Sequence, residues 1–335
     1  ISNEFVDAAR AMIADANNIV IVAHKNPDGD AIGSGLALYN YLTDAGKHAI
    51  FILPDQMPQN MRWMPGADKI LIYKLTPDEG DKIIAKADLV IMADFNKGNR
   101  MGDAAKSFDA SNAKRILIDH HLYPEIRNDL AYSRPEACST AELVFELLTS
   151  LNGNKLSSVI ATCIFTGIMT DTGCFNYNSS EPGTFLTIAH LLECGIKKDQ
   201  IIDNVYNHFS ESRLRLIGFS VNKKMKVLPE YQTAYIWLTK KELEQYNNQQ
   251  GDTEGLVNYP LSIDGVVFSA LFTEKDGLTK CSFRSRGKFP ANKVAAEHFN
   301  GGGHLNAAGG ELYKTIGKTI HYFERVLLEY KSYLE

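Results

Sequence analysis

Three short apolar runs in the first half of the chain each end in side chains that bind metals or transfer protons. The runs and the residues that follow them are 19–23 with His24, 89–93 with Asp94, and 115–118 with Asp119, His120 and His121. Short runs that are apolar on both faces are typical of buried parallel strands. In an open α/β sheet, ligands bind beyond the carboxyl ends of such strands. We therefore expect one shared site at that edge of a parallel sheet.

The loop after His24 reads Asn26-Pro27-Asp28-Gly29-Asp30. Its proline and glycine favour a tight turn, so that one imidazole and two carboxylates can converge on a hard divalent cation. By itself, the loop is equally consistent with an ordinary Asp-Gly turn whose aspartate caps the next helix. The other two runs and a further aspartate, Asp171, at the end of a predicted helix favour the metal site.

The candidate ligands are two imidazoles and four carboxylates from four strand or helix ends: His24, Asp28, Asp30, Asp94, His120 and Asp171. They include no cysteine, which disfavours a structural zinc site of the finger type. The set suits two hard or borderline cations, with Mn²⁺ preferred and Mg²⁺ or Co²⁺ as alternatives. Two such cations can polarise a phosphoryl oxygen and activate water for an in-line displacement.

Composition limits the class of protein and the kind of substrate. The chain has 335 residues, of which 44% are hydrophobic and 22% charged, as in soluble proteins of two domains. Its net charge of −5 argues against binding long duplex nucleic acid but leaves a short anionic ligand open. Residues 1–20 predict an amphipathic helix rather than a signal peptide, and no run is long enough to span a membrane. Five cysteines without C-x-x-C spacing predict reduced thiols in a cytoplasmic protein.

Strands and helices alternate up to about residue 210, which predicts a doubly wound, mostly parallel α/β sheet. Beyond this point, alternating segments flanked by helices predict a smaller α/β domain with a mixed sheet. We expect domains at 1–210 and 229–335, joined by a linker helix at 211–228. The expected helices are 2–17, 31–45, 78–86, 139–151, 156–170, 182–194, 199–209, 210–226, 240–247, 291–299 and 316–333. The expected strands are 19–24, 49–53, 71–73, 89–93, 115–118, 233–238, 265–272 and 279–284.

The C-terminal half contains a candidate phosphate-binding surface. Residues 278–293 hold five basic side chains and no acidic one, a local reversal of the acidic balance of the chain. Further on, Gly301, Gly302 and Gly303 would let backbone N–H groups approach a phosphate closely, and His304 adds a directed donor. For the lysines of the basic segment, a solvated strand face remains the alternative.

In their order along the chain, these motifs resemble those of the DHH phosphoesterase superfamily. The matching segments are Asn26-Pro-Asp-Gly-Asp30, Asp94, Asp119-His120-His121, Thr170-Asp171 and Phe299-Asn300-Gly301-Gly302-Gly303-His304. The resemblance covers nearly the whole chain and is greatest to bifunctional oligoribonucleases that also dephosphorylate 3′-phosphoadenosine 5′-phosphate (pAp). It implies a metal-dependent enzyme that degrades short single-stranded RNA and converts pAp to AMP. A homodimer is left open.

The resemblance also implies a role for each site residue. One metal would be held by His24, Asp28 and Asp94, and the other by Asp30, Asp94, His120 and Asp171, with Asp94 as the bridge. The chain departs from the family pattern at Phe95-Asn96, where a small or polar residue is expected.

Outside the metal ligands, Asp119 would orient a neighbouring imidazole, and His121 would face the scissile phosphate as a donor or proton-transfer group. Arg284 and Ser285 match the substrate contact of the family. Arg100 is a further candidate phosphate contact.

Four other functions share part of this pattern. A phosphodiesterase for linear dinucleotides such as pApA or pGpG would use the same site. A type II pyrophosphatase shares the metal motifs but typically lacks the Gly-Gly-Gly-His run. A RecJ-like exonuclease would need an added domain with a basic, aromatic channel for single strands. A non-enzymatic nucleotide-binding module would have lost metal ligands, and all six are present here.

Overall fold

The computed structural model describes residues 1–207, 209–249 and 251–333. Contacts between Cα atoms divide the chain into two units, the second of which begins at Phe209, and each is described by itself. Position 208 of the helix predicted at 199–209 lies outside the described residues, as do positions 250, 334 and 335 of the predicted second domain. Among the described residues, no helix combines the length and the apolar character needed to cross a bilayer.

The first unit is built on a six-stranded sheet in which every pair of neighbours is parallel. The strand order is β3-β2-β1-β4-β5-β6, so the direction of winding reverses between β1 and β4. Such a switch point is where ligands bind in open α/β sheets. The prediction of a doubly wound parallel sheet is confirmed. The strands are β1 (Asn18–Val22), β2 (His48–Leu53), β3 (Leu71–Ile72), β4 (Leu89–Ala93), β5 (Lys114–Asp119) and β6 (Leu130–Ser133).

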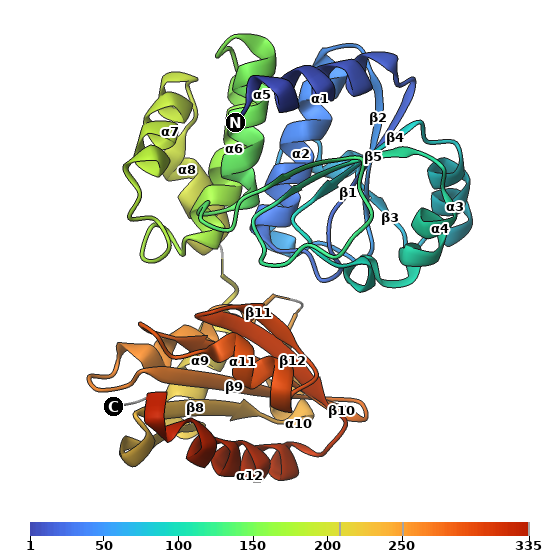
Figure 1. Cartoon of the computed structure of the whole chain (residues 1–335). Coiled ribbons are helices and arrows are strands. Elements are labelled where there is room, and N and C mark those ends of the chain that lie inside the picture. The colour runs from blue at the N-terminus through green and yellow to red at the C-terminus, as the bar shows by residue number, and fades with distance from the viewer. Residues whose placement is uncertain (208, 250, 334–335) are drawn as a thin grey trace. The chain divides into compact units, whose positions relative to one another are not determined.

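Helices cover both faces of this sheet (Figure 1). Ile19 and Ile21 of β1 pack into one apolar core, while Val20 and Val22 pack into the core of the opposite face. The first core is covered by α1 (Asn3–Asp15), α2 (Gly29–Asp44), α5 (Thr140–Asn152) and α6 (Ser158–Asp171), and the second by α3 (Pro77–Ala85) and α4 (Ala105–Ala110). The unit also contains α7 (Pro182–Glu193), α8 (Lys198–Ile202), the 3₁₀ segments Gln59–Met61, Ala67–Lys69 and Gly98–Ala104, and a π-helical turn, Asp203–Asn207.

Helices α2 and α6 approach each other closely because glycines face each other across the contact. A Cβ on Gly33 would lie 2.6 Å from the carbonyl oxygen of Cys163 and 2.8 Å from the backbone nitrogen of Gly167. A Cβ on Gly167 would lie 2.6 Å from the Cβ of Ala141. Since backbone atoms cannot move aside, these positions exclude larger residues. The contact brings the start of α2 and the end of α6 to one edge of the sheet.

The second unit is built on a six-stranded mixed sheet of order β11-β12-β10-β9-β8-β7. The β8–β9 pair is parallel and the other pairs are antiparallel, which confirms the predicted mixed sheet. One face carries α11 (Ala291–His298) and α12 (Ile316–Val326) over an aromatic core, and the other carries α9 (Glu211–Lys223) and α10 (Lys240–Gln245). The strands are β7 (Met225–Leu228), β8 (Thr233–Leu238), β9 (Phe268–Lys275), β10 (Leu278–Ser285), β11 (Gly302–His304) and β12 (Ala307–Leu312), and 3₁₀ segments span Pro229–Tyr231, Leu256–Ser262 and Leu327–Tyr333.

Four strands, β6, β7, β11 and β12, are absent from the sequence prediction. The predicted helix 210–226 was too long, because α9 ends at Lys223 and β7 begins at Met225. The β7 strand is short and lies at the edge of its sheet, so its middle residues are exposed and show no apolar alternation. Helix α9, predicted as part of a linker, buries Leu216 completely against the second unit.

Candidate metal centre

The first cluster lies where β1 and β4 end. His24 Nε2 is 3.6 Å from Asp28 Oδ2 and 3.3 Å from Asp94 Oδ2. The other ring nitrogen, Nδ1, lies 2.8 Å from the carbonyl oxygen of Lys25, to which it donates in the neutral ring. This tautomer turns the lone pair of Nε2 toward the two carboxylates. The Nε2 atom is buried and makes no hydrogen bond with any described residue, which fits a metal ligand.

The second cluster joins residues after β5, at the start of α2 and at the end of α6. His120 Nε2 is 3.8 Å from Asp30 Oδ2, 3.7 Å from Asp94 Oδ1 and 3.5 Å from Asp171 Oδ2. Its Nδ1 lies 3.2 Å from the carbonyl oxygen of Ala137, so the backbone again fixes the tautomer. Asp94 belongs to both clusters and presents one oxygen to each, which is the geometry of a bridging ligand.

The backbone of Asp94 is itself unusual. Its φ of +67° lies in the left-handed region, which costs a residue other than glycine about 1 kcal/mol. Its N–H donates to the carbonyl oxygen of Ile118, 3.0 Å away on the neighbouring strand, and helps to hold this conformation. Phe95, where the chain departs from the family pattern, is fully buried in the core of the opposite face. The departure therefore serves packing and leaves the ligand in place.

Asp28 combines the two functions between which the sequence could not decide. Its Oδ1 accepts hydrogen bonds from the backbone nitrogens of Asp30, 3.1 Å away, and Ala31, 3.0 Å away, and so caps α2. Its Oδ2 faces His24. One carboxylate can therefore start the helix and present an oxygen to the first cluster.

The N-terminus of α5 holds both inner carboxylates. Asp30 accepts hydrogen bonds from the backbone nitrogens of Thr140, at 2.7 Å, and Ala141, at 2.9 Å. The hydroxyl of Thr140 donates to Asp94 Oδ1 at 2.9 Å. Anions are favoured at helix N-termini by the exposed N–H groups and the dipole. Thr140 was missed in the sequence.

A local signal for this helix start was present in the sequence. Ser139 and Glu142 form the S-x-x-E pattern of a capping box, and the Ser139 hydroxyl accepts from the Glu142 backbone nitrogen at 3.1 Å. The pattern follows the third apolar run by about twenty residues. This pattern could have indicated a helix N-terminus near the site. It could not have indicated that this N-terminus binds Asp30 and Asp94.

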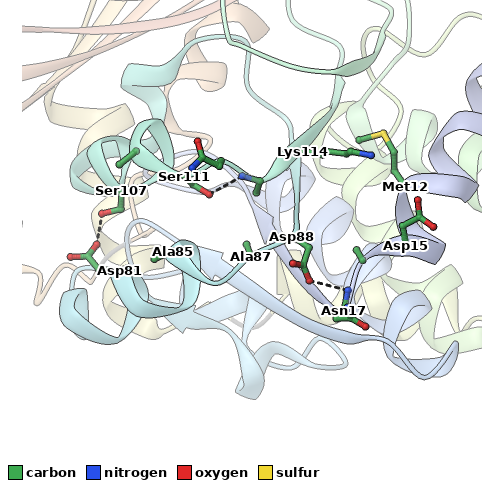
Figure 2. Close-up of a pocket in the computed structure, with 14 residues that line it drawn as sticks. Met12, Asp15, Asn17, Asp81, Ala85, Ala87, Asp88, Ser107, Ser111 and Lys114 are labelled. Atoms are coloured by element: carbon green, nitrogen blue, oxygen red, sulfur yellow. Dashed lines mark hydrogen bonds between the residues drawn. The ribbon is translucent and has the colours of Figure 1, made fainter.

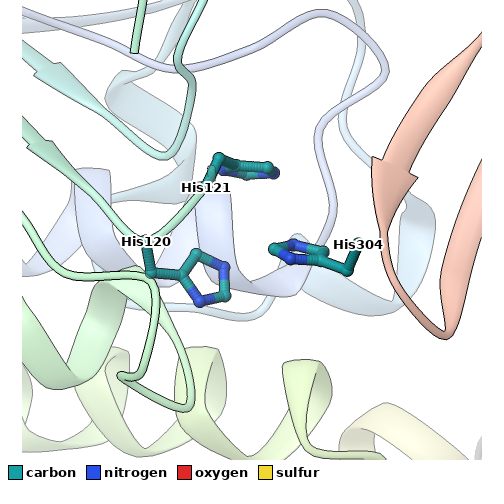
Figure 3. A group of neighbouring side chains, drawn as sticks. All are labelled: His120, His121 and His304. Atoms are coloured by element: carbon teal, nitrogen blue, oxygen red, sulfur yellow. The ribbon is translucent and has the colours of Figure 1, made fainter. Parts of the chain in front are cut away.

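His121 is held by the carboxylate of Asp119. The Nδ1 of His121 lies 2.7 Å from Asp119 Oδ1, and the aspartate is fully buried. The rings of His120 and His121 lie edge to face, with centroids 5.1 Å apart, on the loop after β5 (Figure 3). A carboxylate that orients an imidazole in this way is a common arrangement for proton transfer.

Burial and mutual charge shift the pKa values of the cluster in opposite directions. Burial and neighbouring carboxylates raise the pKa of Asp30 well above its ordinary value, and burial raises that of Asp171 to about 7. Burial alone would lower the pKa of His24, but Asp28 and Asp94 raise it to about 10. Burial alone would raise the pKa of Asp94, yet the close approach of His24 Nε2 and the charges of three histidines lower it. Without metal, bound protons therefore balance the negative charge of the carboxylates. Cations would do the same when bound.

Arg100 lies beside the loop after β1, in the 3₁₀ segment Gly98–Ala104. Its carbonyl oxygen accepts from the Lys25 backbone nitrogen at 2.6 Å. Its positive charge opposes protonation of His24, and the side chain is partly exposed. A cation in this position is available to an anionic ligand of the first cluster.

In the second unit, Arg284 and Ser285 end β10. The Nη1 of Arg284 donates to the carbonyl oxygen of Phe283 at 2.9 Å, while its buried Nε has no hydrogen-bond partner among the described residues. The hydroxyl of Ser285 donates to the carbonyl oxygen of Phe289 at 2.7 Å and accepts from Asn306 Nδ2 at 2.8 Å. The hydroxyl of Ser285 is thus hydrogen-bonded within the unit. Arg284, in contrast, has an Nε–H group without a partner among the described residues.

Of the three consecutive glycines 301–303, two are required because the backbone leaves no room for a side chain. A Cβ on Gly301 would lie 1.9 Å from the carbonyl oxygen of Gly309, and one on Gly303 would lie 2.4 Å from that of Ala307. A Cβ on Gly302 would meet nothing within 4 Å. Gly302 therefore leaves open space next to His304, which ends β11.

A separate hollow of about 710 Å³ lies at the amino ends of β1, β4 and β5, at the opposite edge of the sheet from the metal cluster (Figure 2). Two of the three carboxylates that line it, those of Asp81 and Asp88, accept hydrogen bonds from other described residues. Asp88 Oδ2 accepts from the backbone nitrogens of Asn17, at 3.0 Å, and Asn18, at 2.8 Å, and Asp81 accepts from Ser107. The chemistry of the first unit is therefore at the carboxyl edge.

Comparison with known proteins agrees with this architecture. Residues 18–168 match the DHH family, N-terminal domain, and residues 230–329 match the DHHA1 domain. The chain is 30% identical over 304 residues to the bifunctional oligoribonuclease and PAP phosphatase NrnA of Thermus thermophilus, which covers 91% of this chain and 87% of that protein. It is 25% identical over 340 residues to the cyclic-di-AMP phosphodiesterase GdpP of Bacillus subtilis, covering 96% of this chain and 49% of that protein.

A solved structure shares the whole fold. It is an exopolyphosphatase-related protein from Bacteroides fragilis, with a TM-score of 0.95 and 45% identity over 100% of this chain and 98% of that one. The identity to the NrnA protein over nearly the full length of both chains agrees with the two family matches and the shared fold. The chain therefore belongs to the DHH family of phosphoesterases and joins a DHH domain to a DHHA1 domain.

Proposed function

We propose that this chain is a metal-dependent phosphoesterase that degrades short RNA oligonucleotides and dephosphorylates pAp to AMP, as a 3′(2′),5′-bisphosphate nucleotidase. The observation that carries the proposal is the position of Asp94, which presents one carboxylate oxygen to His24 and the other to His120. Two ligand clusters that share a carboxylate are the arrangement of a dinuclear hydrolase. The similarity to NrnA proteins over most of the chain supports the choice of substrates.

Two divalent cations are proposed, with Mn²⁺ preferred and Mg²⁺ or Co²⁺ as alternatives. Within each of two groups of three residues, His24-Asp28-Asp94 and Asp30-His120-Asp171, the ligand atoms lie within 4.8 Å of one another. Both histidines use Nδ1 on backbone carbonyls and turn Nε2 to the carboxylates, which supports their role as ligands. When bound, the cations supply Lewis acidity to the phosphoryl group and lower the pKa of water.

The remaining residues act on substrate and protons. His121, oriented by Asp119, is proposed to transfer a proton at the scissile phosphate. Arg284, with a buried donor that has no partner among the described residues, and Arg100 are proposed to bind phosphate. Three glycines, of which Gly302 alone leaves space for a ligand, and His304 complete the phosphate contacts. Ser285 is also proposed as part of this site. Its hydrogen bonds with Phe289 and Asn306 support a role in holding the end of β10 in place.

We also propose that the substrates are single-stranded and the compartment cytoplasmic. The net charge of −5 does not favour long duplexes. The five cysteines are all free thiols, which agrees with a reducing environment.

A substrate panel tests the proposal. Protein loaded with Mn²⁺ is assayed on pAp, RNA of two to five nucleotides, a long single strand, an RNA duplex and pyrophosphate, with Asp94→Asn as the inactive control. We expect AMP and phosphate from pAp, mononucleotides from the short RNAs, and little turnover of the duplex or the long strand. Hydrolysis of pyrophosphate alone would indicate a pyrophosphatase instead, and equal rates on short and long strands would indicate a RecJ-like exonuclease.

A second candidate substrate is a linear dinucleotide such as pApA or pGpG. It is favoured by the similarity to cyclic-di-AMP phosphodiesterases, which extends over 96% of this chain. The kcat/KM values for pApA, pGpG and pAp, measured side by side, decide which is preferred.

A further inference from the structure

The loop after His121 carries an exposed aromatic ring. Tyr123 lies two positions beyond this histidine, and 77% of its surface is exposed. Two residues of chain span at most about 7 Å, so the tyrosine lies beside the group that is proposed to act on the scissile phosphate. Both ends of the loop are anchored, because His121 bonds to Asp119 and Ile126 is buried in the apolar core shared with α3 and α4.

The backbone of Tyr123 is held in an unusual conformation. Its φ of +55° lies in the left-handed region, which residues with bulky side chains rarely adopt. Tyr123 also precedes Pro124, and the residue before a proline is normally extended. Such conformations persist only where surrounding contacts fix them, and they are frequent at ligand-binding sites. Both departures from ordinary backbone preference fall on the residue that carries the exposed ring.

Asn96 supplies the contacts that fix this loop. Its Nδ2 donates to the carbonyl oxygen of Leu122 at 2.6 Å, and its own carbonyl oxygen accepts from the backbone nitrogen of Glu125 at 2.7 Å. The side chain of Glu125 also pairs with Lys97, with 2.9 Å between Nζ and Oε1. Residues 122–125 are therefore clamped to the segment that follows the shared ligand Asp94. Asn96 belongs to the two positions at which the chain departs from the family pattern.

A rigid, exposed ring beside a phosphate site suits a nucleobase. Every base has a flat face that stacks on an aromatic side chain, whatever its hydrogen-bonding groups. Tyrosine makes such contacts at a low cost in conformational entropy, because only two side-chain torsions have to be fixed. A protein partner would need about 800 Å² of surface, and Tyr123 with its exposed neighbour Leu122 offers far less.

We propose that Tyr123 stacks on the nucleobase of the nucleotide whose phosphate lies at the metal cluster. Asn96 is then a positioning residue that holds the loop for this contact. The inference rests on the proposed function, because it takes a nucleotide as the substrate. Since stacking reads no base edge, the contact favours phosphate esters that carry a base over those that lack one and selects little among the four bases.

The first experiment compares two substrates that differ only by the base. They are pAp and ribose 3,5-bisphosphate, and kcat/KM is measured for each with Mn²⁺ present. Tyr123→Ala is expected to lose roughly 5- to 150-fold on pAp and nothing on the ribose compound. Tyr123→Phe retains the ring and is expected to match the wild type on both. Circular dichroism melting verifies that each variant keeps the fold.

Tyr313→Ala is the matched control for an exposed tyrosine. Tyr313 is 74% exposed and follows the end of β12 that pairs with Thr279, whereas Arg284 pairs with the other end of that strand. We expect this variant to keep the wild-type kcat/KM on both substrates. A loss on pAp in the Tyr123 variant alone is therefore a property of that ring and not of removing any exposed tyrosine.

The role of Asn96 is tested by a double-mutant cycle. Asn96→Ala removes the donor to Leu122 and leaves the backbone bond to Glu125. Alone, it is expected to lower kcat/KM on pAp by less than Tyr123→Ala does and to leave the ribose compound unaffected. In the Tyr123→Ala background it is expected to cost nothing further, because the ring that it positions is absent. A merely structural role would give the same loss in both backgrounds.

A binding measurement does not depend on turnover. Tyr123→Trp places an indole at the site, and its fluorescence is expected to be quenched by AMP but not by ribose 5-phosphate. The wild type, with its native Trp63 and Trp237, gives the background signal. If the wild type did not hydrolyse pAp, the proposed function would fail, and quenching by AMP would still decide whether the ring meets a base.

Three outcomes would overturn the inference. The first is a Tyr123→Ala variant with wild-type kcat/KM on pAp. The second is an equal loss on pAp and ribose 3,5-bisphosphate, which would show that the ring does not act through the base. The third is quenching of the Tyr123→Trp signal by ribose 5-phosphate as strong as that by AMP.

Discussion

Replacing Thr140 by valine should weaken metal binding without unfolding the protein. Valine has nearly the shape of threonine but lacks the hydroxyl that donates to Asp94 Oδ1 at 2.9 Å. Both residues are buried, with 0% and 1% of their surface exposed, so no water can replace the lost donor. The backbone nitrogen of residue 140, which donates to Asp30, is unchanged. The substitution therefore removes one hydrogen bond to the carboxylate that both clusters share.

The magnitude follows from the charge of the acceptor. A hydrogen bond to a charged group contributes about 1.5–3 kcal/mol, which corresponds to roughly a 10- to 100-fold change in an equilibrium constant. Removing a partner that orients a metal ligand costs about the same factor in metal affinity. Because Asp94 faces both clusters, we expect binding of both ions to weaken, each by no more than this factor.

The assay is a calorimetric titration of the metal-free protein with Mn²⁺. Thr149→Val is the matched control, since Thr149 lies on the same helix and its hydroxyl donates to the carbonyl oxygen of Phe145 at 2.8 Å. We expect the control to bind Mn²⁺ as the wild type does. Equal affinities for Thr140→Val and the wild type, or an equal loss in both variants, would refute the role given to Thr140.

Three further predictions concern the second unit. Gly302→Ala should raise KM for pAp at unchanged stability, because its Cβ enters open space, whereas Gly303→Ala should lower the melting temperature, because its Cβ would lie 2.4 Å from a carbonyl oxygen. Gly218→Ala, in an exposed stretch of α9 with nothing within 4 Å, should raise the free energy of unfolding by about 0.5–1 kcal/mol in urea titrations. Burial alone would raise the pKa of Glu324, but the bond from Lys226 Nζ at 2.7 Å lowers it. Glu324→Gln should therefore cost up to about 1 kcal/mol above pH 4.5, and the difference should vanish as the pH falls through the lowered pKa.

The central part of the fold could be predicted because its signal is local. The strands β1, β4 and β5 are apolar on both faces, and each is followed directly by the residues that form the clusters. Since parallel strands share one carboxyl edge, the sequence was sufficient to bring His24, Asp94 and His120 together.

The parts that could not be predicted depend on contacts between distant residues or on weak patterns. Thr140 acts on Asp94, 46 positions away, and no local feature names that partner. The β11 and β12 strands consist largely of glycine and alanine, which have low strand propensity, and their pairing is fixed by backbone contacts. For Asp28, the sequence supported both a helix cap and a metal ligand. In the structure, its Oδ1 caps α2 and its Oδ2 faces His24.

The central claim is that the first unit holds the metals and that the second binds the phosphate of the substrate. The measurement that tests it most directly is bound Mn²⁺ and pAp turnover for the wild type, His120→Ala and His304→Ala, side by side. We expect about two ions per wild-type chain. His120→Ala should lose metal and kcat together, whereas His304→Ala should keep the metal and lose roughly 10- to 100-fold in kcat/KM. The claim would be contradicted if His304→Ala lost metal or kept wild-type kcat/KM, or if the wild type remained fully active in excess chelator.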